Sequence, residues 1–426
     1  MAPDIQVLKH KYDVYGATFN QDETRILTWS ADSTSRLWDT ASGAPIGPAL
    51  RHDGTVIGAV YNKDETRILT WSYDGTARLW DATNIAPIYL VLKHDSPVVG
   101  AIFNKDNTSI LTWSLDKTVR LWDVAIGAPI DLTLRHSDEI LKAVFNKNET
   151  RILTWSRDNT ARLWDSATGN QIGLTMKHND VVRGAVFNKD ETRILSWSND
   201  NSARLWDSAT GNQIGLTIKH DDDVNGAVFN KSENHIITWS NDGTARLWDS
   251  ATGNQIGLTM NHDDFVHGAA LNQDETLILT WGGDNTARLW DSVTGNQIGL
   301  TMKHDGSVSG AAFNQDGTHI ITWSSDYTAR LWDSATGNQI GLTMKHDEDV
   351  RGAVFNKDET RILTWSDGGT ARLWDSATGN QIGLTMNHYD YVKGAAFNQN
   401  ETFIITWGHH EVGFGMPQTV SNLVRL

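Results

Sequence analysis

The chain has no cysteine among its 426 residues and only seven prolines. Without thiols it can depend on no disulfide and no thiolate chemistry, and a reducing compartment suits it. No apolar run approaches the length of a membrane span, and the start, MAPDIQVLKH, lacks the basic and then apolar layout of a secretory signal. From these absences we expect a cytoplasmic protein that does not enter a membrane.

Clusters of basic residues are lacking as well. The chain holds 36 Lys and Arg against 52 Asp and Glu, which gives a formal net charge of -16 at pH 7. A phosphate backbone is bound through positive charge, so we expect no nucleic-acid partner.

What the chain does have is a repeat of 42 residues. Ten histidines, from His10 to His388, keep this spacing without a slip. The 19 tryptophans form two series with the same period, ten in the string Thr/Ser-Trp-Ser/Gly and nine directly before Asp. A fixed period of this length predicts a repeat architecture. Because no linker interrupts the period, we interpret residues 1–426 as a single domain of ten repeats that begin at His10.

One repeat, residues 178–219, predicts a four-stranded antiparallel sheet. Three short apolar or alternating runs and a weaker fourth are separated by turns rich in Asn, Asp and Gly. In the second run Ile194 points to one face and Leu195 to the other, so both faces of the sheet are apolar. Such a sheet needs neighbours on both sides. Stacked four-stranded sheets protect their edges best in a ring.

The repeat resembles that of the WD-repeat β-propeller family, with near-identical blades of a bacterial type. The pattern His-x3-Val/Ile-x-Gly-Ala-x-Phe, followed by Leu/Ile-Thr/Ser-Trp-Ser-x-Asp-x-Thr/Ser-Ala-Arg-Leu-Trp-Asp, recurs nine or ten times over residues 4–410. The resemblance implies an all-β ring of four-stranded antiparallel blades that serves as a docking platform without catalysis. Ten blades in one ring is our expectation. A seven- or eight-bladed ring plus extra blades is the alternative, since propellers commonly have four to eight blades.

The two ends of the chain depart from the repeat. The tenth repeat has no Trp-Asp after its second strand, so we interpret residues 411–426 as a degenerate last blade and a tail. Residues 4–9, DIQVLK, precede the first histidine, where a fourth strand should lie. The resemblance implies that residues 1–9 close the ring by completing the last blade.

The resemblance also implies a hydrogen-bonded tetrad in each blade, formed in the fifth repeat by Asp200, His178, Ser196 and Trp206. The indole N–H donates to the hydroxyl, the hydroxyl to the imidazole, and the imidazole to the carboxylate. A hydrolase triad is normally single, whereas this set recurs about ten times with a tryptophan attached. We therefore expect no enzyme.

Three short segments suggest ligand chemistry only weakly. His409, His410 and Glu411 offer metal ligands, but consecutive side chains on a strand diverge, so a degenerate turn is the favoured interpretation. Residues 221–223, three aspartates, lack the spacing of further calcium ligands. Residues 413–415, Gly-Phe-Gly, lack the third glycine of a nucleotide loop. We expect no metal and no cofactor.

Three columns of the repeat vary, whereas the segment ARLWD-S-x-T-GNQIGLT is nearly invariant in each copy between residue 161 and residue 385. One column follows the apolar residue that opens the first strand, one lies two residues earlier, and one directly precedes the tetrad Asp. The resemblance implies that all three gather at the loop rim near the channel. The candidate binding residues are Tyr15, Ile57, Val99, Leu141, Arg183, Asn225, His267, Ser309, Arg351, Lys393, Phe265, Tyr391, Tyr73 and Arg157.

Two interpretations of these columns stay open. Exposed loops drift neutrally by default. Alternatively, the columns form a mosaic surface that binds a protein or peptide, with a basic partner favoured by the Asp-rich neighbouring loops. A small ligand or glycan in the channel is the second functional class. We expect a monomer, and a blade-exchanged oligomer is the alternative because near-identical repeats can exchange.

Overall fold

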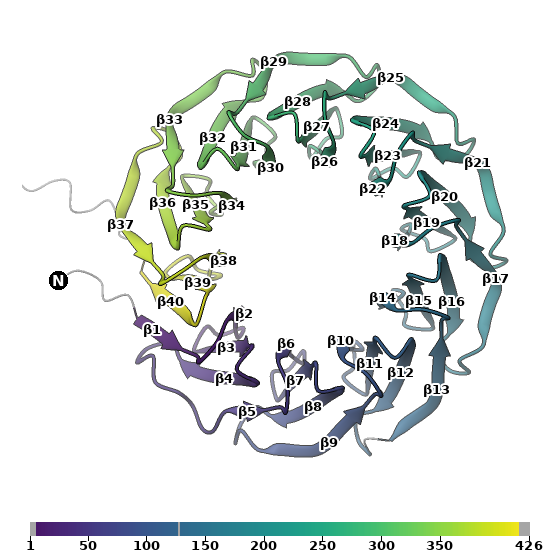
Figure 1. Ribbon diagram of the computed structural model, residues 1–426, viewed down its shortest axis with the longest axis vertical. Coiled ribbons are helices and arrows are strands. Elements are labelled where there is room, and N and C mark those ends of the chain that lie inside the picture. The colour runs from purple at the N-terminus through teal and green to yellow at the C-terminus, as the bar shows by residue number, and fades with distance from the viewer. Residues whose placement is uncertain (1–5, 127, 417–426) are drawn as a thin grey trace, which may run out of the picture.

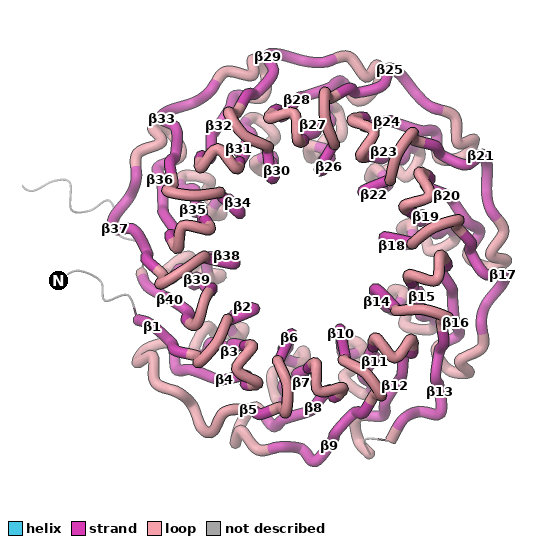
Figure 2. Tube along the Cα trace, in the orientation of Figure 1, coloured by secondary structure: helices cyan, strands magenta, loops and turns pink. Residues whose placement is uncertain are grey.

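The computed structural model describes residues 6–126 and 128–416, and these form one ring of ten four-stranded antiparallel sheets around an open channel (Figure 1). Within the described residues the regular structure is entirely β-strand, joined by turns and loops (Figure 2). The expected ring of ten blades is therefore confirmed, and the seven- or eight-bladed alternative is wrong. No helix of the described residues is long and apolar enough to cross a membrane.

Each blade begins with a strand that lines the channel and is followed by a second strand that returns along it. The innermost strands are β2 (Val14–Phe19), β6 (Val56–Tyr61), β10 (Val98–Phe103), β14 (Ile140–Phe145), β18 (Val182–Phe187), β22 (Val224–Phe229), β26 (Val266–Leu271), β30 (Val308–Phe313), β34 (Val350–Phe355) and β38 (Val392–Phe397). The second strands are β3 (Arg25–Ser30), β7 (Arg67–Ser72), β11 (Ser109–Ser114), β15 (Arg151–Ser156), β19 (Arg193–Ser198), β23 (His235–Ser240), β27 (Leu277–Gly282), β31 (His319–Ser324), β35 (Arg361–Ser366) and β39 (Ile404–Gly408).

The third and fourth strands complete each blade toward the outer circumference. The third strands are β4 (Thr34–Asp39), β8 (Thr76–Asp81), β12 (Thr118–Asp123), β16 (Thr160–Asp165), β20 (Ser202–Asp207), β24 (Thr244–Asp249), β28 (Thr286–Asp291), β32 (Thr328–Asp333), β36 (Thr370–Asp375) and β40 (Glu411–Gly415). The fourth strands are β5 (Leu50–Arg51), β9 (Pro87–Lys93), β13 (Pro129–Arg135), β17 (Gln171–Lys177), β21 (Gln213–Lys219), β25 (Gln255–Asn261), β29 (Gln297–Lys303), β33 (Gln339–Lys345), β37 (Gln381–Asn387) and, in blade 10, β1 (Gln6–Lys9).

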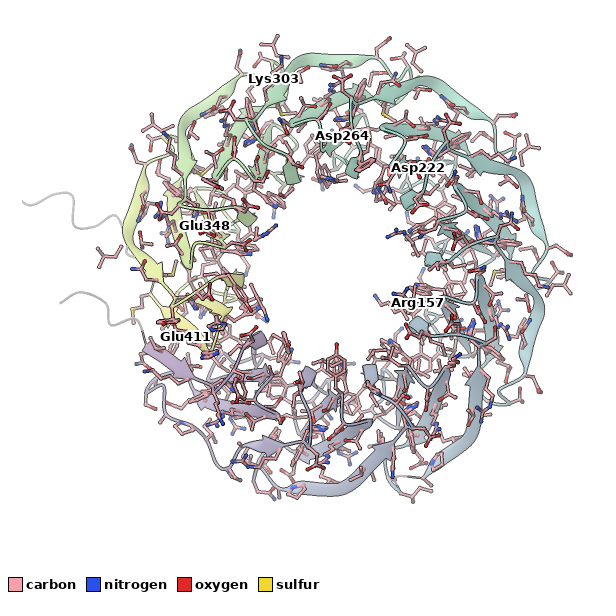
Figure 3. The ribbon with its side chains drawn as sticks, viewed as in Figure 1. Arg157, Asp222, Asp264, Lys303, Glu348 and Glu411 are labelled. Atoms are coloured by element: carbon pink, nitrogen blue, oxygen red, sulfur yellow. The ribbon has the colours of Figure 1, made fainter. Side chains whose placement is uncertain are left out.

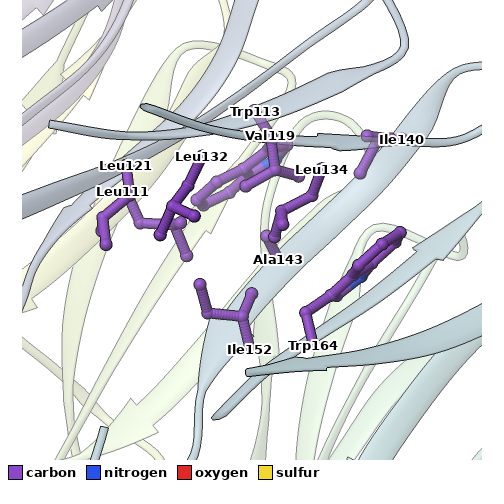
Figure 4. Packing of buried hydrophobic residues seen from close by; sticks show 10 residues of the cluster. All are labelled: Leu111, Trp113, Val119, Leu121, Leu132, Leu134, Ile140, Ala143, Ile152 and Trp164. Atoms are coloured by element: carbon purple, nitrogen blue, oxygen red, sulfur yellow. The ribbon is translucent and has the colours of Figure 1, made fainter. Parts of the chain in front are cut away.

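The hydrophobic core is divided among the junctions between neighbouring blades. In blade 5, Ile194 and Trp206 pack against blade 4, whereas Leu195 and Leu205 pack against blade 6. Figure 4 shows one such junction, where side chains from Leu111 to Trp164 meet between blades 3 and 4. Both faces of a blade are thus buried, as the sequence predicts. A single blade could not hold this core by itself.

The second-strand tryptophans also pack within their own blades. A Cβ atom built on Gly184 would lie 2.1 Å from the ring of Trp197, with which Gly184 is paired across β18 and β19. The glycine of the Gly-Ala pair is therefore needed to seat the indole, which then contacts the junction with the next blade. The bulky indole fits because the residue that faces it on the first strand, Gly184, has no side chain.

A side-chain clasp joins the turns between the first and second strands of neighbouring blades. Glu191, whose φ is 61°, accepts hydrogen bonds from the Lys147 backbone N–H and from Asn146 Nδ2 of the preceding blade. The same contact recurs around the described part of the ring, with Asn107 replacing Glu between blades 2 and 3. Between blades 7 and 8 the position holds Gly317, which has no acceptor to offer. The left-handed φ thus favours Gly, while the clasp favours Glu.

A backbone clasp joins the outer strands of blades 4 to 9. Leu174 N donates to Thr210 O at 2.7 Å, and the bond recurs at each following junction up to Leu342 N and Thr378 O at 2.8 Å. A Cβ atom on Gly173 would lie 2.5 Å from Thr210 C, so the approach requires glycine. These contacts give a physical reason for the near-identity of residues 161–385, because each copy must fit both neighbours.

The ring closes where the two chain ends meet. β1 pairs antiparallel with β40, so the purple first strand lies beside the yellow last blade in Figure 1. Leu8, 1 % exposed, is buried between blades 10 and 1 with Val14 and Phe414. Glu23 of blade 1 clasps Asn398 and Gln399 of blade 10, as its counterparts do elsewhere.

The tenth blade is more complete than its sequence predicts. Residues 411–415 form its third strand although they lack Trp-Asp, because Val412 and Phe414 supply the buried side chains. The closing strand spans residues 6–9 of the expected 1–9, and residues 1–5 and 417–426 lie outside the described residues.

Candidate functional site

The ring has two faces with different loops. One, which we call the tetrad face, carries the loops between blades and the turns between second and third strands. The other, the clasp face, carries the turns between first and second strands and between third and fourth strands. The tetrad histidines and aspartates and all three variable columns belong to the tetrad face.

The tetrad of blade 5 is a continuous chain of hydrogen bonds. Trp206 Nε1 donates to Ser196 Oγ at 2.7 Å, His178 Nε2 lies 2.7 Å from the same oxygen, and His178 Nδ1 lies 3.1 Å from Asp200 Oδ1. Asp200 also accepts the Asn179 backbone N–H at 2.9 Å, which fixes the loop between blades. The tetrad thus ties strands β19 and β20 to the tetrad face.

Burial and hydrogen bonding set the charge states of these groups. Burial raises the pKa of the Asp200 carboxyl, but hydrogen bonds from His178 and Ser202 outweigh it and leave the pKa well below its usual range. Burial lowers the pKa of His178, against the pull of Asp200. Ser196 is fully buried with its hydroxyl held between two rings, an arrangement that suits a structural role.

Blades 9 and 10 lack this carboxylate. In blade 9 Gly368 occupies the Asp position, and His346 Nδ1 lies 2.8 Å from Thr370 Oγ1 instead. Burial beside Arg372 lowers the pKa of His346 to about 3. In blade 10 burial lowers the pKa of His388 to about 4, and its Nδ1 lies 3.7 Å from the nearest carboxylate, Glu411 Oε1.

The structure brings the three variable columns together. Arg183, in the first column, contacts Asn199 of the third column in its own blade and Asp223 of the second column in the next blade, the latter at 3.3 Å. Asn225 Nδ2 donates to Asn241 of its own blade at 2.7 Å and to Val266 O of the next blade at 3.2 Å. The columns therefore form one band around the channel mouth, in which neighbouring blades contact each other.

The candidate residues differ in how much of each side chain is exposed and available to a partner. Tyr15, Tyr73 and Phe265 are 39 %, 53 % and 48 % exposed. Val99 and Leu141 pack against the cores of their junctions. Ile57 and Ser309 lie on the channel wall, half-buried and exposed respectively.

Several charged candidates are engaged within the ring. Arg157 pairs with Glu139 at 3.1 Å, and Arg351 pairs with Asp367. His267 Nδ1 lies 3.1 Å from Val308 O of the next blade. These side chains join loops to one another as well as lining the rim.

The seam between blades 10 and 1 has its own cluster at this face. Lys393 Nζ donates to Asp13 Oδ2 at 3.2 Å, and the Tyr391 hydroxyl donates to the same oxygen. The sequence prediction included Lys393 and Tyr391 but missed Asp13. The signal for it lay in the column it shares with Asp223 and Phe265.

The turn of His409 and His410 differs from the expectation that its side chains diverge. The turn between β39 and β40 has two residues, whereas the turn between β19 and β20 has three. His410 has a φ of 63°, which breaks the alternation of a strand. The two imidazoles consequently stack with their centroids 3.8 Å apart.

Two exposed aromatic residues of the tetrad face escaped the sequence prediction. Tyr12 and Tyr327 are each 48 % exposed. Tyr12 lies in the loop between blades, and Tyr327 has a φ of 69° in the turn between β31 and β32. Each is the single aromatic residue in a column that otherwise holds polar residues and glycine, a signal that could have found them.

Comparisons with known proteins agree with this architecture. The family model "WD domain, G-beta repeat" matches residues 87–123, 170–207, 211–249, 253–291 and 295–333. None of the curated proteins that were compared matches the chain. Among solved structures, the computationally designed Ika8 protein is similar in fold, with 20% sequence identity, a TM-score of 0.51, and coverage of 76% of this chain and 97% of that one. The chain is a WD-repeat β-propeller of ten blades.

Proposed function

We propose that the tetrad face binds a protein or peptide partner and that the chain serves as a non-catalytic interaction scaffold. One observation carries the proposal: among the side chains that the structure describes, the aromatic ones that are at least 36 % exposed all lie on this face. Aromatic side chains are the usual anchors of protein interfaces. They are Tyr12, Tyr15, Tyr73, Phe265, Tyr327 and Tyr389.

The charge of the tetrad face favours a basic partner. The residue after the tetrad histidine is most often Asp, and its side chain is 93 % exposed at Asp221, 95 % at Asp263 and 96 % at Asp305. Asp222, Asp264 and Glu348 add to this charge, and Figure 3 places them on the blades between the channel and the outer strands. Association with such a surface should weaken as salt is added.

Selection from a displayed library of random peptides tests the proposal. We expect the chain to enrich Lys- and Arg-rich peptides, and replacing Tyr73, Phe265 and Tyr327 together by Ser to weaken their binding at least tenfold. A matched control replaces Leu216, Leu258 and Leu300 by Ser. These side chains lie on the outer circumference and are slightly more exposed than the three aromatic ones, and the control should bind normally. Equal binding by both triple variants would contradict the proposal.

A second candidate is a small ligand or glycan on the channel wall. A hollow of about 960 Å³ lies toward the clasp face, where Phe145, Phe187 and Phe229 follow one another around the channel. Aromatic rings in a row can stack on sugars or other flat ligands. A glycan array distinguishes the two candidate functions. If the channel binds a glycan, binding should be lost in Phe187→Ser and kept in the triple Ser variant of Tyr73, Phe265 and Tyr327.

A further inference from the structure

The seam between blades 10 and 1 gathers three potential metal ligands. Asp13 precedes β2 of blade 1, while His409 and His410 form the turn between β39 and β40 of blade 10. One ligand atom from each residue lies within 4.8 Å of the other two. No other set of three His, Cys, Asp or Glu residues in the described part of the chain meets this condition.

We propose that Asp13, His409 and His410 bind a divalent transition-metal ion, for which Zn²⁺ is the best match. Two imidazoles and one carboxylate are ligands that zinc accepts, with water in the fourth position. Tetrahedral ligands about 2.1 Å from the ion lie about 3.4 Å from one another. Because the imidazoles of His409 and His410 are stacked and nearly parallel, one ring has to rotate before nitrogens of both can face the same ion. The ion would join the first and last blades of the ring.

The contact between His409 and Asp13 supports this assignment. His409 Nδ1 lies 2.7 Å from Asp13 Oδ1, yet the two are not aligned for a hydrogen bond, and the buried Nδ1 has no hydrogen-bond partner among the described residues. The two atoms would have to move apart by about 0.7 Å to reach the separation of ligands on one zinc ion. Unlike the tetrad imidazoles of blades 1 to 8, this ring is not committed to a hydroxyl and a carboxylate.

The surroundings hold the ligands in place. Tyr391 and Lys393 both donate to Asp13 Oδ2, which leaves Oδ1 directed at His409. Partners of this kind orient metal ligands and commonly change metal affinity by about 10- to 100-fold.

Besides the stacking of the two imidazoles, the charge of Lys393 opposes a cation. Its ammonium lies 3.2 Å from Asp13 Oδ2 and 4.0 Å from the ring of Tyr15. Its charge weakens binding of a dication without blocking Oδ1. In Lys393→Met the Tyr391 hydroxyl still donates to Asp13 Oδ2, so the proposal predicts that loss of the ammonium charge raises the affinity for zinc. If the cluster is only structural, neither chain binds zinc.

Titration of the metal-stripped full chain with Zn²⁺, followed by calorimetry, tests the proposal, and Co²⁺ provides a visible absorption spectrum of the bound ion. We expect one equivalent, a higher melting temperature with zinc, and at least tenfold weaker binding in His410→Ala and in Asp13→Asn. Tyr391→Phe should weaken binding about tenfold.

Two controls separate this site from adventitious binding. Asp223→Asn changes the same column in blade 6, and His319→Ala removes a surface imidazole, so both should bind zinc as the unchanged chain does. Far-ultraviolet circular dichroism establishes that each variant is folded. The proposal is overturned if the unchanged chain binds no zinc, or if the His409→Ala/His410→Ala double variant still binds one equivalent.

Discussion

The seam between blades 10 and 1 and the junctions inside the ring reach the same geometry with different residues. An internal blade such as blade 5 is one continuous segment with a complete tetrad, whereas blade 10 takes its outer strand from residues 6–9 and has no tetrad carboxylate. The seam and the junction between blades 4 and 5 both keep the glutamate clasp and a buried apolar core. Closure therefore depends on contacts between blades, and an individual blade can lose internal polar bonds.

Deleting residues 1–9 should lower the free energy of unfolding more than any other change at the seam. The deletion takes away β1, its pairing with β40 and the burial of Leu8. Leu8→Ala alone should cost about 2–5 kcal/mol of unfolding free energy, and the deletion more. Val7→Ala, at a side chain that is 43 % exposed, is the matched control. Urea unfolding measures all three, and an unchanged midpoint for the deletion would refute closure by this strand.

The next largest loss of stability is expected when the tetrad carboxylate that blade 9 lacks is also removed from blade 8. Asp326 accepts hydrogen bonds from the Asp305 and Thr328 backbones and lies 2.9 Å from His304 Nδ1. Asp326→Gly should therefore destabilise the chain by about 1–3 kcal/mol, since buried polar groups lose a partner. Thermal and urea unfolding measure the cost. A neutral result would mean that the tetrad carboxylate contributes nothing to an internal blade.

Repairing blade 9 should reduce the acid sensitivity of the ring. His346 has a pKa of about 3 when folded and an ordinary pKa of about 6.5 when unfolded, so protons bind preferentially to the unfolded chain. The stability that neutral His346 contributes is fully present above pH 6.5. It is lost as the pH falls toward 3, at up to about 1.4 kcal/mol per pH unit. Gly368→Asp supplies a carboxylate and should flatten the decline between pH 6.5 and 4.5.

Unfolding free energies measured in urea at several pH values check this result. Gly368 has no left-handed φ, and a Cβ atom there would lie 3.3 Å from the nearest neighbour, Glu348 N, so the substitution requires the loop at Glu348 to shift by a few tenths of an ångström. An equally steep decline in Gly368→Asp would show that His346 is not the source.

The clasp should give the smallest change. Glu191→Ala removes the bonds to Asn146 and Lys147 and keeps a side chain at positive φ, so we expect a cost of about 0.5–1.5 kcal/mol. Glu191→Gly loses the same bonds but relieves the backbone, so its cost should be smaller. Denaturant midpoints of the two variants give the comparison. If Glu191→Gly destabilises the chain more than Glu191→Ala does, the positive φ at this position causes no measurable backbone strain.

The sequence predicts most of the fold and only part of the site. The period, the turns and the two apolar faces of RILSWS specify a ring of identical sheets, and the structure has that ring. Whether ten blades close cannot be predicted from the sequence alone, because closure depends on the angle between blades. That angle is set by contacts such as the Glu191 clasp and the approach of Gly173 to Thr210, which link residues of different repeats.

The site was harder to predict because its columns interact across blades. Arg183 is a variable position and contacts another variable position, Asp223 of the next blade. Variation between repeats therefore locates the rim, but it does not show which side chains are available to a partner. The turn of His409 and His410 was misjudged because one missing residue puts His410 in a left-handed conformation. Single-residue changes in turn length cannot be inferred from composition.

A disulfide across the seam tests the closed ring of ten blades most directly, since the chain has no cysteine of its own. Lys9 and Glu411 are paired, and because His10 N donates to His410 O they form a non-hydrogen-bonded pair, with Cα atoms about 4.5 Å apart. In the Lys9→Cys/Glu411→Cys chain we expect a disulfide within monomers, detected by mass spectrometry of peptides. Free thiols, or bonds only between chains, would contradict closure.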